Sequence, residues 1–531
     1  MSDPLRIDFV SPLPPVRSGI ADYSADLLPH LESRCDLRVI RLPGQPVAES
    51  IESRWHPGPA EVTGADGRLP LYQMGNNRYH EGVLRLARER PGVLTLHDLV
   101  LHHLLIESTF GESEREFRAY LRRLAADHGW AGELTAKVRQ WGELGQAALF
   151  ELAARQTLLR RQHGILVHSR WAVDTVREGD PEVRVKAVPM AVPLPERVDP
   201  AAALAIRRRF GVEPQDRLLG SFGFQTPIKR TDRVIEALAR SELGGAHLLV
   251  AGEVSPVLEL EQLAREAGVA DRVHFAGYLP YEDFETAIAA CDLCLNLRYP
   301  TAGETSASLL RVLAVGRPAL VSDYGPSAEL PDEVAVKVPL GEDEVEALAA
   351  RTGRLLAEPG QLAEMAEAAR DYVRRWHDPA RAAAAVVEAC GELAETEPPG
   401  DRFSQIAPPT SYLWRRLSGR VEVGGAEPPW LEGTARRLQI RLINGGPARW
   451  LAARNEFGGL MIELQWRKSP WHPSLGGTWL MLSRDLEPGE SRELEVDLRR
   501  PLGAGMLIVE PHARGVAGFY ALGGPFWFRV I

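Results

Sequence analysis

Two hydrophobic patterns divide the chain. From its start to about residue 395, short apolar runs such as 5–10 and 218–222 alternate with amphipathic segments of helical period. This alternation predicts parallel strands joined by helices in doubly wound α/β sheets. After about residue 410, runs such as 437–443 alternate apolar and polar residues and are separated by turns that contain Gly and Pro. That second pattern predicts a small antiparallel β-sandwich.

The patterns predict three domains. Residues 1–195 and 196–395 are expected to be Rossmann-like α/β units, with the last helix of the second unit packed back on the first. Residues 396–410 have the composition of a linker, and residues 411–531 form the all-β domain. Ligands of such sheets bind beyond the carboxyl ends of the strands, so the cleft between the two α/β units is the expected site.

Composition narrows the function classes. The 531 residues carry a formal net charge of −10, with 45 % hydrophobic and 25 % charged residues, so the chain is globular and has no general attraction to nucleic acid. Four scattered Cys favour a reducing compartment, and no stretch reaches the roughly 20 apolar residues of a membrane span. We expect a cytoplasmic protein, peripheral to the inner face of the membrane at most.

The segment 112–161 is predicted to be wholly helical and amphipathic. Its apolar positions, including Phe117 and Leu121, lie opposite Arg115, Arg118 and Arg122. This pattern favours a core-facing helix with a solvated basic side. A face for an acceptor or a membrane surface is the alternative.

One stretch carries candidate chemistry. In residues 298–311 (RYPTAGETSASLLR) a polar turn with a Gly joins a buried-type strand to a helix. Thr305 and Ser306 can cap that helix, and the other N–H groups of its first turn make a site for a phosphate. Glu304 beside such a site is suited to accept hydrogen bonds from the hydroxyls of a ribose or a sugar. The turn therefore predicts a nucleotide-sugar pocket, with an ordinary capped turn as the alternative.

Several motifs, in order along the chain, resemble those of one family. Residues 1 to about 395 are similar to a retaining GT-B glycosyltransferase of family four. The motifs that carry the resemblance are 14–23 (PPVRSGIADY), 71–80 (LYQMGNNRYH), 91–98 (PGVLTLHD), 168–169 (HS), 220–229 (GSFGFQTPIK) and 303–318 (GETSASLLRVLAVGRP). The resemblance implies transfer of a sugar from a nucleotide-diphosphate sugar to an acceptor hydroxyl with retention, from a UDP- or GDP-linked donor.

The resemblance and the residue chemistry together assign roles. Lys229, joined by the helix N–H groups and by Arg230 or Arg298, is expected to stabilise the leaving phosphate. Glu304 is expected to hold donor hydroxyls, and His97 to contact the sugar, with Asp98 setting the tautomer of His97. The expected catalytic residues are thus His97, Lys229 and Glu304.

The remaining assignments concern binding. The expected donor-binding residues are Gly19, Gly223, Lys229, Arg230, Arg298, Gly303, Glu304, Thr305 and Ser306. The expected acceptor-side residues are Asp22, Asn76, His80 and Asp98. The cleft strands contain no Asp-x-Asp, so we expect no metal and no cofactor beyond the nucleotide sugar itself.

Two positions depart from the family pattern. Phe224 stands where the family has an Arg, and Arg311 where it repeats a Glu. These departures favour an alternative in which the fold has lost turnover and acts as a glycan-binding or scaffold protein. A nucleotide-sugar epimerase or hydrolase on the same fold is a further alternative.

The C-terminal domain more weakly resembles Trp-containing Ig-like modules of bacterial surface-polysaccharide enzymes. Residues 444–450, 486–490 and 523–528 carry this likeness. Most of its Trp are expected in the core, whereas Trp471 and Trp479 are expected to be exposed and to bind a glycan or partner. The resemblance implies a role in polysaccharide or glycoconjugate synthesis, with a glycan or a lipid-linked acceptor.

Overall fold

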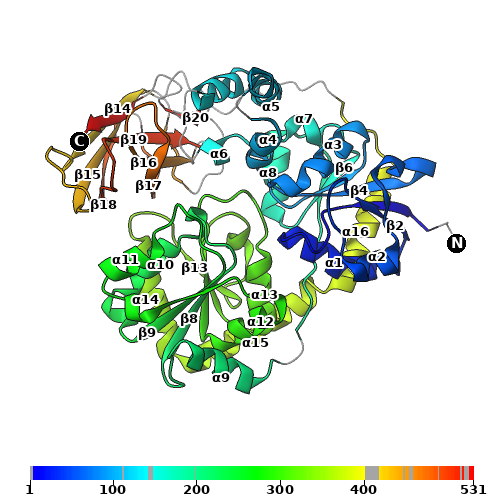
Figure 1. The fold of residues 1–531 in the computed structure, drawn as a ribbon, viewed down its shortest axis with the longest axis horizontal. Coiled ribbons are helices and arrows are strands. Elements are labelled where there is room, and N and C mark those ends of the chain that lie inside the picture. The colour runs from blue at the N-terminus through cyan, green and yellow to red at the C-terminus, as the bar shows by residue number, and fades with distance from the viewer. Residues whose placement is uncertain are drawn as a thin grey trace.

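The computed structural model describes residues 4–110, 113–140, 148–195, 198–400, 418–446, 449–453, 459–487, 489–514, 517–519 and 525–531. Figure 1 shows two α/β domains and a smaller all-β domain. The predicted fold class is confirmed. Residues 401–410 of the expected linker lie outside the described residues.

The first domain is built on a parallel sheet with strand order β3-β2-β1-β4-β5-β6-β7. The strands are β1 (Arg6–Val10), β2 (Asp36–Arg41), β3 (Gly58–Pro59), β4 (Leu69–Met74), β5 (Val93–Leu96), β6 (Gly164–Val167) and β7 (Val185–Ala187). Every residue of β5 and β6 is buried, because helices cover both faces of a parallel sheet. This is why these strands are nearly uniform apolar runs.

Eight α-helices belong to the described part of the first domain. They are α1 (Gly19–Glu32), α2 (Glu49–Trp55), α3 (Glu81–Glu89), α4 (His102–Thr109), α5 (Glu114–Gln140), α6 (Ala148–Glu151), α7 (Gln156–Leu159) and α8 (Arg170–Gly179). Helix α2 and a short strand, β3, form within the stretch 43–69, which is rich in Gly and Pro. The expectation that 112–161 is wholly helical was wrong, because Gly129 has a positive φ of 57° inside α5 and residues 152–155 are not helical.

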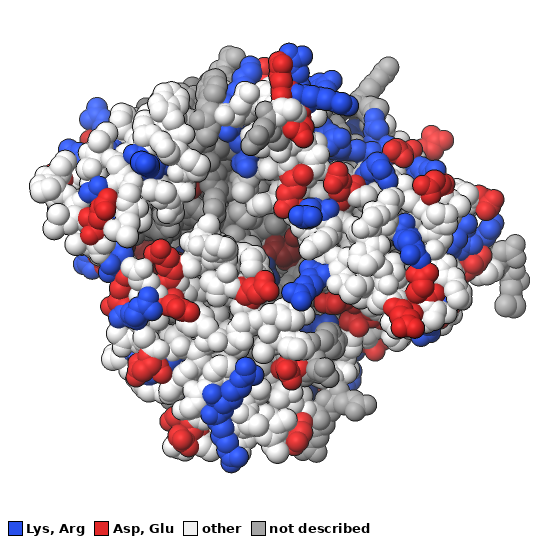
Figure 2. Space-filling model, in the orientation of Figure 1, with Lys and Arg blue, Asp and Glu red and all other residues white. Residues whose placement is uncertain are grey.

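The basic side of α5 faces solvent. Arg115, Arg118 and Arg122 are exposed, whereas Phe117 and Leu121 on the other side are half-buried. Figure 2 shows cationic side chains gathered over this part of the surface. In the described residues, no helix is both long and apolar enough to cross a membrane.

The second domain repeats the plan with strand order β10-β9-β8-β11-β12-β13. Its strands are β8 (Arg217–Phe222), β9 (Ala246–Ala251), β10 (Val273–Gly277), β11 (Leu293–Asn296), β12 (Ala319–Ser322) and β13 (Ala335–Val338). Its helices are α9 (Pro200–Arg209), α10 (Thr231–Leu238), α11 (Leu260–Glu266), α12 (Tyr281–Ala290), α13 (Ala307–Val315), α14 (Glu344–Ala357) and α15 (Pro359–Trp376).

Helix α16 (Pro379–Ala394) returns to the first domain. A Cβ added to Gly164 of β6 would lie 2.4 Å from Leu393, so the helix packs directly on that strand. The hydroxyl of Thr396 donates to the carbonyl of His163 at 2.7 Å just beyond the helix. The chain thereby ties the two α/β domains together at the side away from the all-β domain (Figure 1).

The C-terminal domain contains two antiparallel sheets that share a core of Trp and aliphatic residues. One sheet is β14 (Gly419–Gly424), β15 (Ala435–Asn444) and β18 (Ser491–Arg499). The other is β16 (Leu460–Arg467), β17 (Ser474–Met481), β19 (Met506–Ala513), β20 (Ala517–Gly518) and β21 (Trp527–Val530). In β15 and β18 alternate residues are buried, which is the period-two pattern seen in the sequence.

Candidate active site at the interdomain cleft

The turn between β11 and α13 is braced by its own side chains. Ser306 is the N-cap of α13 and accepts the Leu309 N–H at 3.2 Å. The Arg298 guanidinium pairs with Glu304 and donates to the Ser306 hydroxyl at 3.1 Å. The Thr301 hydroxyl donates to the second oxygen of Glu304 at 2.8 Å. Glu304 is therefore held in one orientation at the start of the helix.

The beginning of α13 is suited to bind an anion. The first N–H groups of a helix have no partner within the helix, and the helix dipole adds a partial positive charge there. Ser306 satisfies the N–H of Leu309, which leaves those of Ala307 and Ser308 pointing out of the helix start. Thr305, expected to help cap the helix, is half-buried, and the cap is Ser306 alone.

Lys229 lies beside this turn, from the loop after β8. Its Nζ donates to the carbonyl of Phe222. Gly223 has a φ of 91°, and a Cβ there would lie 2.7 Å from Nζ, so the close approach requires glycine. Burial, with the nearby charge of Arg298, holds the pKa of Lys229 well below its usual value, against the opposing effect of Glu304. An arriving phosphate would favour the charged form of Lys229.

The two α/β domains meet at the same turn. The N–H groups of Leu99 and Val100, in the first domain, donate to the carbonyl of Ala302 at 2.5 and 3.1 Å. Gly303 has a φ of 83°, and a Cβ there would lie 2.4 Å from Cγ of Leu99. This glycine therefore permits the contact between the domains.

A second carboxyl group faces the turn from the first domain. One oxygen of Asp98 accepts the N–H of Asn76 at 2.8 Å. Burial, together with the charge of Glu304, raises the pKa of Asp98 to about 7, while Asn76 and Arg298 act in the opposite direction. Near neutral pH, Asp98 can thus hold a proton beside Glu304.

His97 belongs to a chain of buried polar groups. Its Nδ1 lies 3.2 Å from Nε2 of His168, whose Nδ1 lies 3.1 Å from the carbonyl of Val188. The carbonyl only accepts, so Nδ1 of His168 carries hydrogen, and Nδ1 of His97 donates to His168. Burial lowers the pKa of both rings, to about 4 for His168, so both are neutral.

The other nitrogen of His97 also has a protein partner. Nε2 lies 2.9 Å from Oε1 of Gln73, and the amide nitrogen of Gln73 has no partner among the described residues. Both observations fit a rotated amide whose NH2 donates to His97. The expectation that Asp98 sets the tautomer of His97 was wrong, because His168 and Gln73 hold the ring. Both ring nitrogens of His97 thus have protein partners in this structure.

Two expected acceptor-side residues have protein partners. His80 is fully buried and its Nδ1 lies 3.0 Å from the side-chain oxygen of Asn77. Burial lowers the pKa of His80 to about 3. Asn76 accepts the Leu104 N–H at 3.0 Å and bonds His103 with its amide nitrogen, which anchors α4 to the end of β4. These contacts correct the expectation that His80 and Asn76 face an acceptor.

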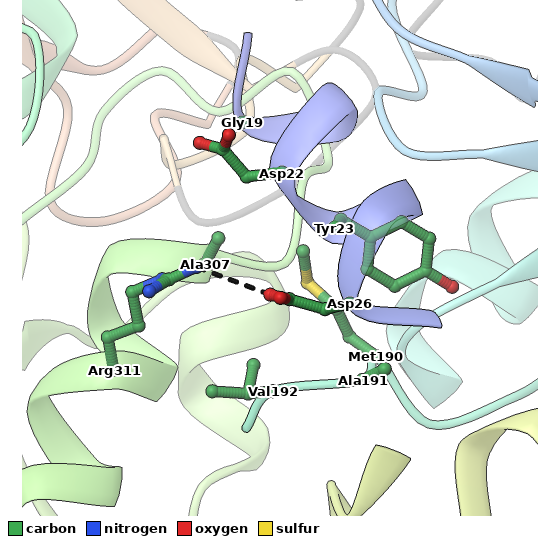
Figure 3. Close-up of a pocket in the computed structure, with 9 residues that line it drawn as sticks. All are labelled: Gly19, Asp22, Tyr23, Asp26, Met190, Ala191, Val192, Ala307 and Arg311. Atoms are coloured by element: carbon green, nitrogen blue, oxygen red, sulfur yellow. Dashed lines mark hydrogen bonds and ion pairs between the residues drawn. The ribbon is translucent and has the colours of Figure 1, made fainter. Parts of the chain in front are cut away.

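Asp22 is exposed and lines a small pocket between α1 and α13 (Figure 3). Gly19, at the start of α1, lies at the same pocket with nothing near the position of an added Cβ. Arg311 reaches across to Asp26 at 3.4 Å, and Figure 3 shows this ion pair between the two helices. The Arg at the position of the second family Glu therefore joins the two domains. Sequence reasoning missed Asp26, although the unusual Arg311 indicated that an acidic partner exists.

Arg230 and Phe224 differ from the expected donor loop. Arg230 is buried and pairs with Glu344, which corrects the expectation that it binds the donor. Phe224 is 53 % exposed on the loop after β8. Among the described residues no cluster of three or more His, Cys, Asp or Glu could hold a metal ion.

The C-terminal domain lies against the same region. Trp479 is only 9 % exposed and packs on Phe150 of the first domain, with ring centroids 6.3 Å apart. Trp471 is 76 % exposed. The expectation of an exposed Trp471 is confirmed, and that of an exposed Trp479 was wrong because it fills an interface between domains.

Comparisons with known proteins agree with this geometry. Residues 204–372 match the family described as glycosyl transferases group 1. A 2-deoxystreptamine glucosyltransferase of Streptomyces kanamyceticus is 30 % identical over 237 residues, which are 43 % of this chain and 55 % of that protein. The chain thus spans about half the length of this relative. The residues that match the family lie in the second α/β domain, which carries β11, α13 and the turn between them.

Solved structures share the fold of both α/β domains. The Anabaena protein HepE in complex with UDP-glucose has a TM-score of 0.51 at 16 % identity, over 73 % of this chain and 100 % of that one. A sucrose-phosphate synthase from Thermosynechococcus elongatus has a TM-score of 0.50 at 16 % identity, over 73 % and 99 %. At these identities the likeness establishes the two-domain GT-B fold.

Proposed function

We propose that the chain, with its glycosyltransferase group 1 domain, transfers a sugar from a nucleotide-diphosphate sugar to an acceptor hydroxyl with retention. The observation that carries the proposal is the braced turn at β11–α13, where Glu304 is held beside both Lys229 and the start of a helix. In this site Lys229 and the start of the helix can bind a diphosphate, and the carboxylate of Glu304 can bind the hydroxyls of a sugar.

UDP-glucose is the donor we propose to test first. The HepE structures hold UDP and UDP-glucose, and the curated relative is a glucosyltransferase. A GDP-linked donor is the second choice. The acceptor is proposed to be a glycan or lipid-linked hydroxyl of a surface polysaccharide or glycoconjugate.

In the proposed reaction the bond between the anomeric carbon and the phosphate oxygen breaks while the acceptor oxygen bonds that carbon from the same face. The acceptor proton passes to the departing phosphate oxygen, and the nucleoside diphosphate leaves. Lys229 and the N–H groups of Ala307 and Ser308 stabilise the charge that develops on the phosphate. Glu304 orients the sugar through its hydroxyls, and no step in this scheme requires a metal.

Contact between the domains prepares the site. The bonds from Leu99 and Val100 to Ala302 fix the first domain against the turn. A carboxyl of that domain, Asp98, can hold a proton and donate it to a sugar or acceptor oxygen. Such closure brings donor and acceptor together and excludes water.

The experiment is a thermal-stability panel of UDP-, GDP-, ADP- and TDP-sugars with the native chain, Lys229→Ala and Glu304→Gln. We expect one nucleotide to raise the melting temperature of the native chain and to have little effect on Lys229→Ala. Lys337→Ala, which removes a lysine paired with the exposed Asp332 in the same domain, is the matched control. No shift with any donor would refute the donor site.

A second candidate is a donor-binding protein without turnover. The ion pair of Arg311 with Asp26 favours it, because a cation occupies the place of the second family Glu. Donor binding without release of nucleotide in the presence of glycan acceptors would support this candidate. Release of free sugar, or its conversion to an epimer, would support the hydrolase or epimerase alternative.

We also propose that the protein acts in the cytoplasm, at the inner face of the membrane. All four Cys are buried free thiols, as expected for a reducing compartment. Fractionation of cells into soluble, peripheral and integral proteins tests this location. Recovery of the chain outside the cytoplasm would refute it.

A further inference from the structure

Two strands of the second sheet of the C-terminal domain, β16 and β19, are buried on both faces. Every residue of β16 and β19 is buried. Leu460, Ile462, Leu464 and Trp466 point into the core between the two sheets. The alternate face includes Met461, which joins the apolar cluster at the cleft. One face of this sheet therefore serves an interface with the α/β domains.

That interface reaches the turn that carries Glu304. Met461, Trp479 and Met481 form one apolar cluster with Tyr299 and Ala302. Ala302 is the residue that binds the first domain, so all three domains meet at this point. In Figure 1 the all-β domain lies beside both α/β domains, with α6 between it and the first domain.

Arg514 makes a buried polar contact in this interface. It follows β19, is 1 % exposed, and donates from its guanidinium to the carbonyl of Thr301. The guanidinium lies 5.1 Å from the ring centroid of Tyr324, in a cation–π contact. Burial lowers the pKa of Arg514 to about 10, and the neighbouring Tyr299 and Glu304 counteract this effect. Arg514 is thus a buried cation in the field of Glu304.

The contact leads to Glu304 through a single residue. The Thr301 hydroxyl donates to Glu304 at 2.8 Å and accepts the Gly303 N–H at 2.9 Å. Arg514 holds the carbonyl of the same Thr301. A shift of that backbone would move the hydroxyl which fixes the carboxylate.

We propose that Arg514 is a positioning residue for Glu304, and that the C-terminal domain thereby completes the sugar-binding part of the donor site. The part of this inference that concerns the sugar rests on the proposed function. The part that concerns the order of the turn does not.

The same domain pair supplies a matched control. Arg492 of β18 pairs with Glu342 at 2.9 Å, with both side chains 31 % exposed. This ion pair also joins the C-terminal domain to the second α/β domain, but the hydrogen bonds of Arg492 to described residues go to Glu342 and not to the 298–306 turn. Arg492→Met therefore reports on docking alone, and Arg514→Met on docking together with the turn.

The experiment compares the full-length native chain, Arg514→Met, Arg514→Lys and Arg492→Met. The first readout is hydrogen exchange of peptides that cover 298–306, without ligand. The second is the ratio of the Kd of UDP to that of UDP-glucose, measured by calorimetry. We expect Arg514→Met to speed exchange in the turn and to weaken UDP-glucose binding about tenfold, with UDP affinity within about twofold of native.

The expected control results separate positioning from docking. Arg514→Lys keeps a donor and should restore part of the UDP-glucose affinity, whereas Arg492→Met should match the native chain in both readouts. Native exchange and a native Kd ratio in Arg514→Met, or equal effects in Arg492→Met, would overturn the proposal. If Arg514→Met does not fold, Arg514→Lys tests the proposal instead. The lysine bonds the Thr301 carbonyl with a different geometry, so hydrogen exchange in the 298–306 turn must change if Arg514 orders it.

Failure of the proposed function gives a different result. A native chain that binds neither UDP nor UDP-glucose refutes the donor site. Exchange of the 298–306 turn would then still decide whether Arg514 orders it.

Discussion

Gly303 and Leu99 come from different domains and touch: a Cβ on Gly303 would lie 2.4 Å from Cγ of Leu99. We predict that Gly303→Ala lowers the free energy of unfolding by about 1–3 kcal/mol, because of this clash and the positive φ. The measurement is urea unfolding. Adding Leu99→Ala to Gly303→Ala should recover the part of the lost free energy of unfolding that is due to the clash. No recovery would contradict the contact between the two residues.

His97→Ala tests the role of that ring. Since both ring nitrogens bond protein groups and the ring packs 4.9 Å from that of Tyr23, we expect a loss of about 2–4 kcal/mol in unfolding free energy. UDP-glucose affinity should change little once the protein is folded. A large loss of UDP-glucose affinity at native stability would instead support direct contact between His97 and the sugar.

Asp98 predicts a pH dependence of stability. Its pKa is raised from 3.8 to about 7 in the folded protein, so between these values the folded state keeps a proton that the unfolded state loses. The contribution of Asp98 is therefore most favourable below about pH 4 and declines as pH rises to about 7. Asp98→Asn should lack this decline, measured by urea unfolding from pH 4 to 8. If the free energies of unfolding of the native chain and of Asp98→Asn change with pH in parallel, the raised pKa of Asp98 is contradicted.

Arg311→Glu should weaken the contact between α1 and α13. The variant removes the partner of Asp26 and adds a carboxylate near Asp22 and Glu285, so we expect the pKa of Asp26 to rise above about 6. The free energy of unfolding should fall by about 1–3 kcal/mol. The exposed Arg374→Glu on α15 is the control and should change stability little. Asp26→Arg combined with Arg311→Glu should recover part of the loss.

Much of the fold could be predicted because its signals are local. The uniform apolar run of β5 and the alternation in β15 follow from burial on two faces and on one face. The cap at Ser306 and the place of Glu304 also follow from neighbouring residues. Such features depend on a few positions along the chain.

The features that were missed depend on contacts between distant segments. Trp479 lies in a stretch rich in Gly and Pro, yet another domain covers it. The partner of Arg311 is on α1, and that of Arg514 is a backbone carbonyl, which leaves no trace in the sequence. The periodicity of 112–161 likewise concealed the break at Gly129.

The most direct test of the donor site is calorimetric titration of UDP and UDP-glucose into the native chain, Lys229→Ala and Glu304→Gln. We predict that the native chain binds UDP-glucose more tightly than UDP. Lys229→Ala should weaken both ligands by about ten- to a hundredfold, and Glu304→Gln should weaken UDP-glucose alone, because one group holds the phosphate and the other the sugar. Equal affinities of all three proteins for both ligands would contradict the proposed site.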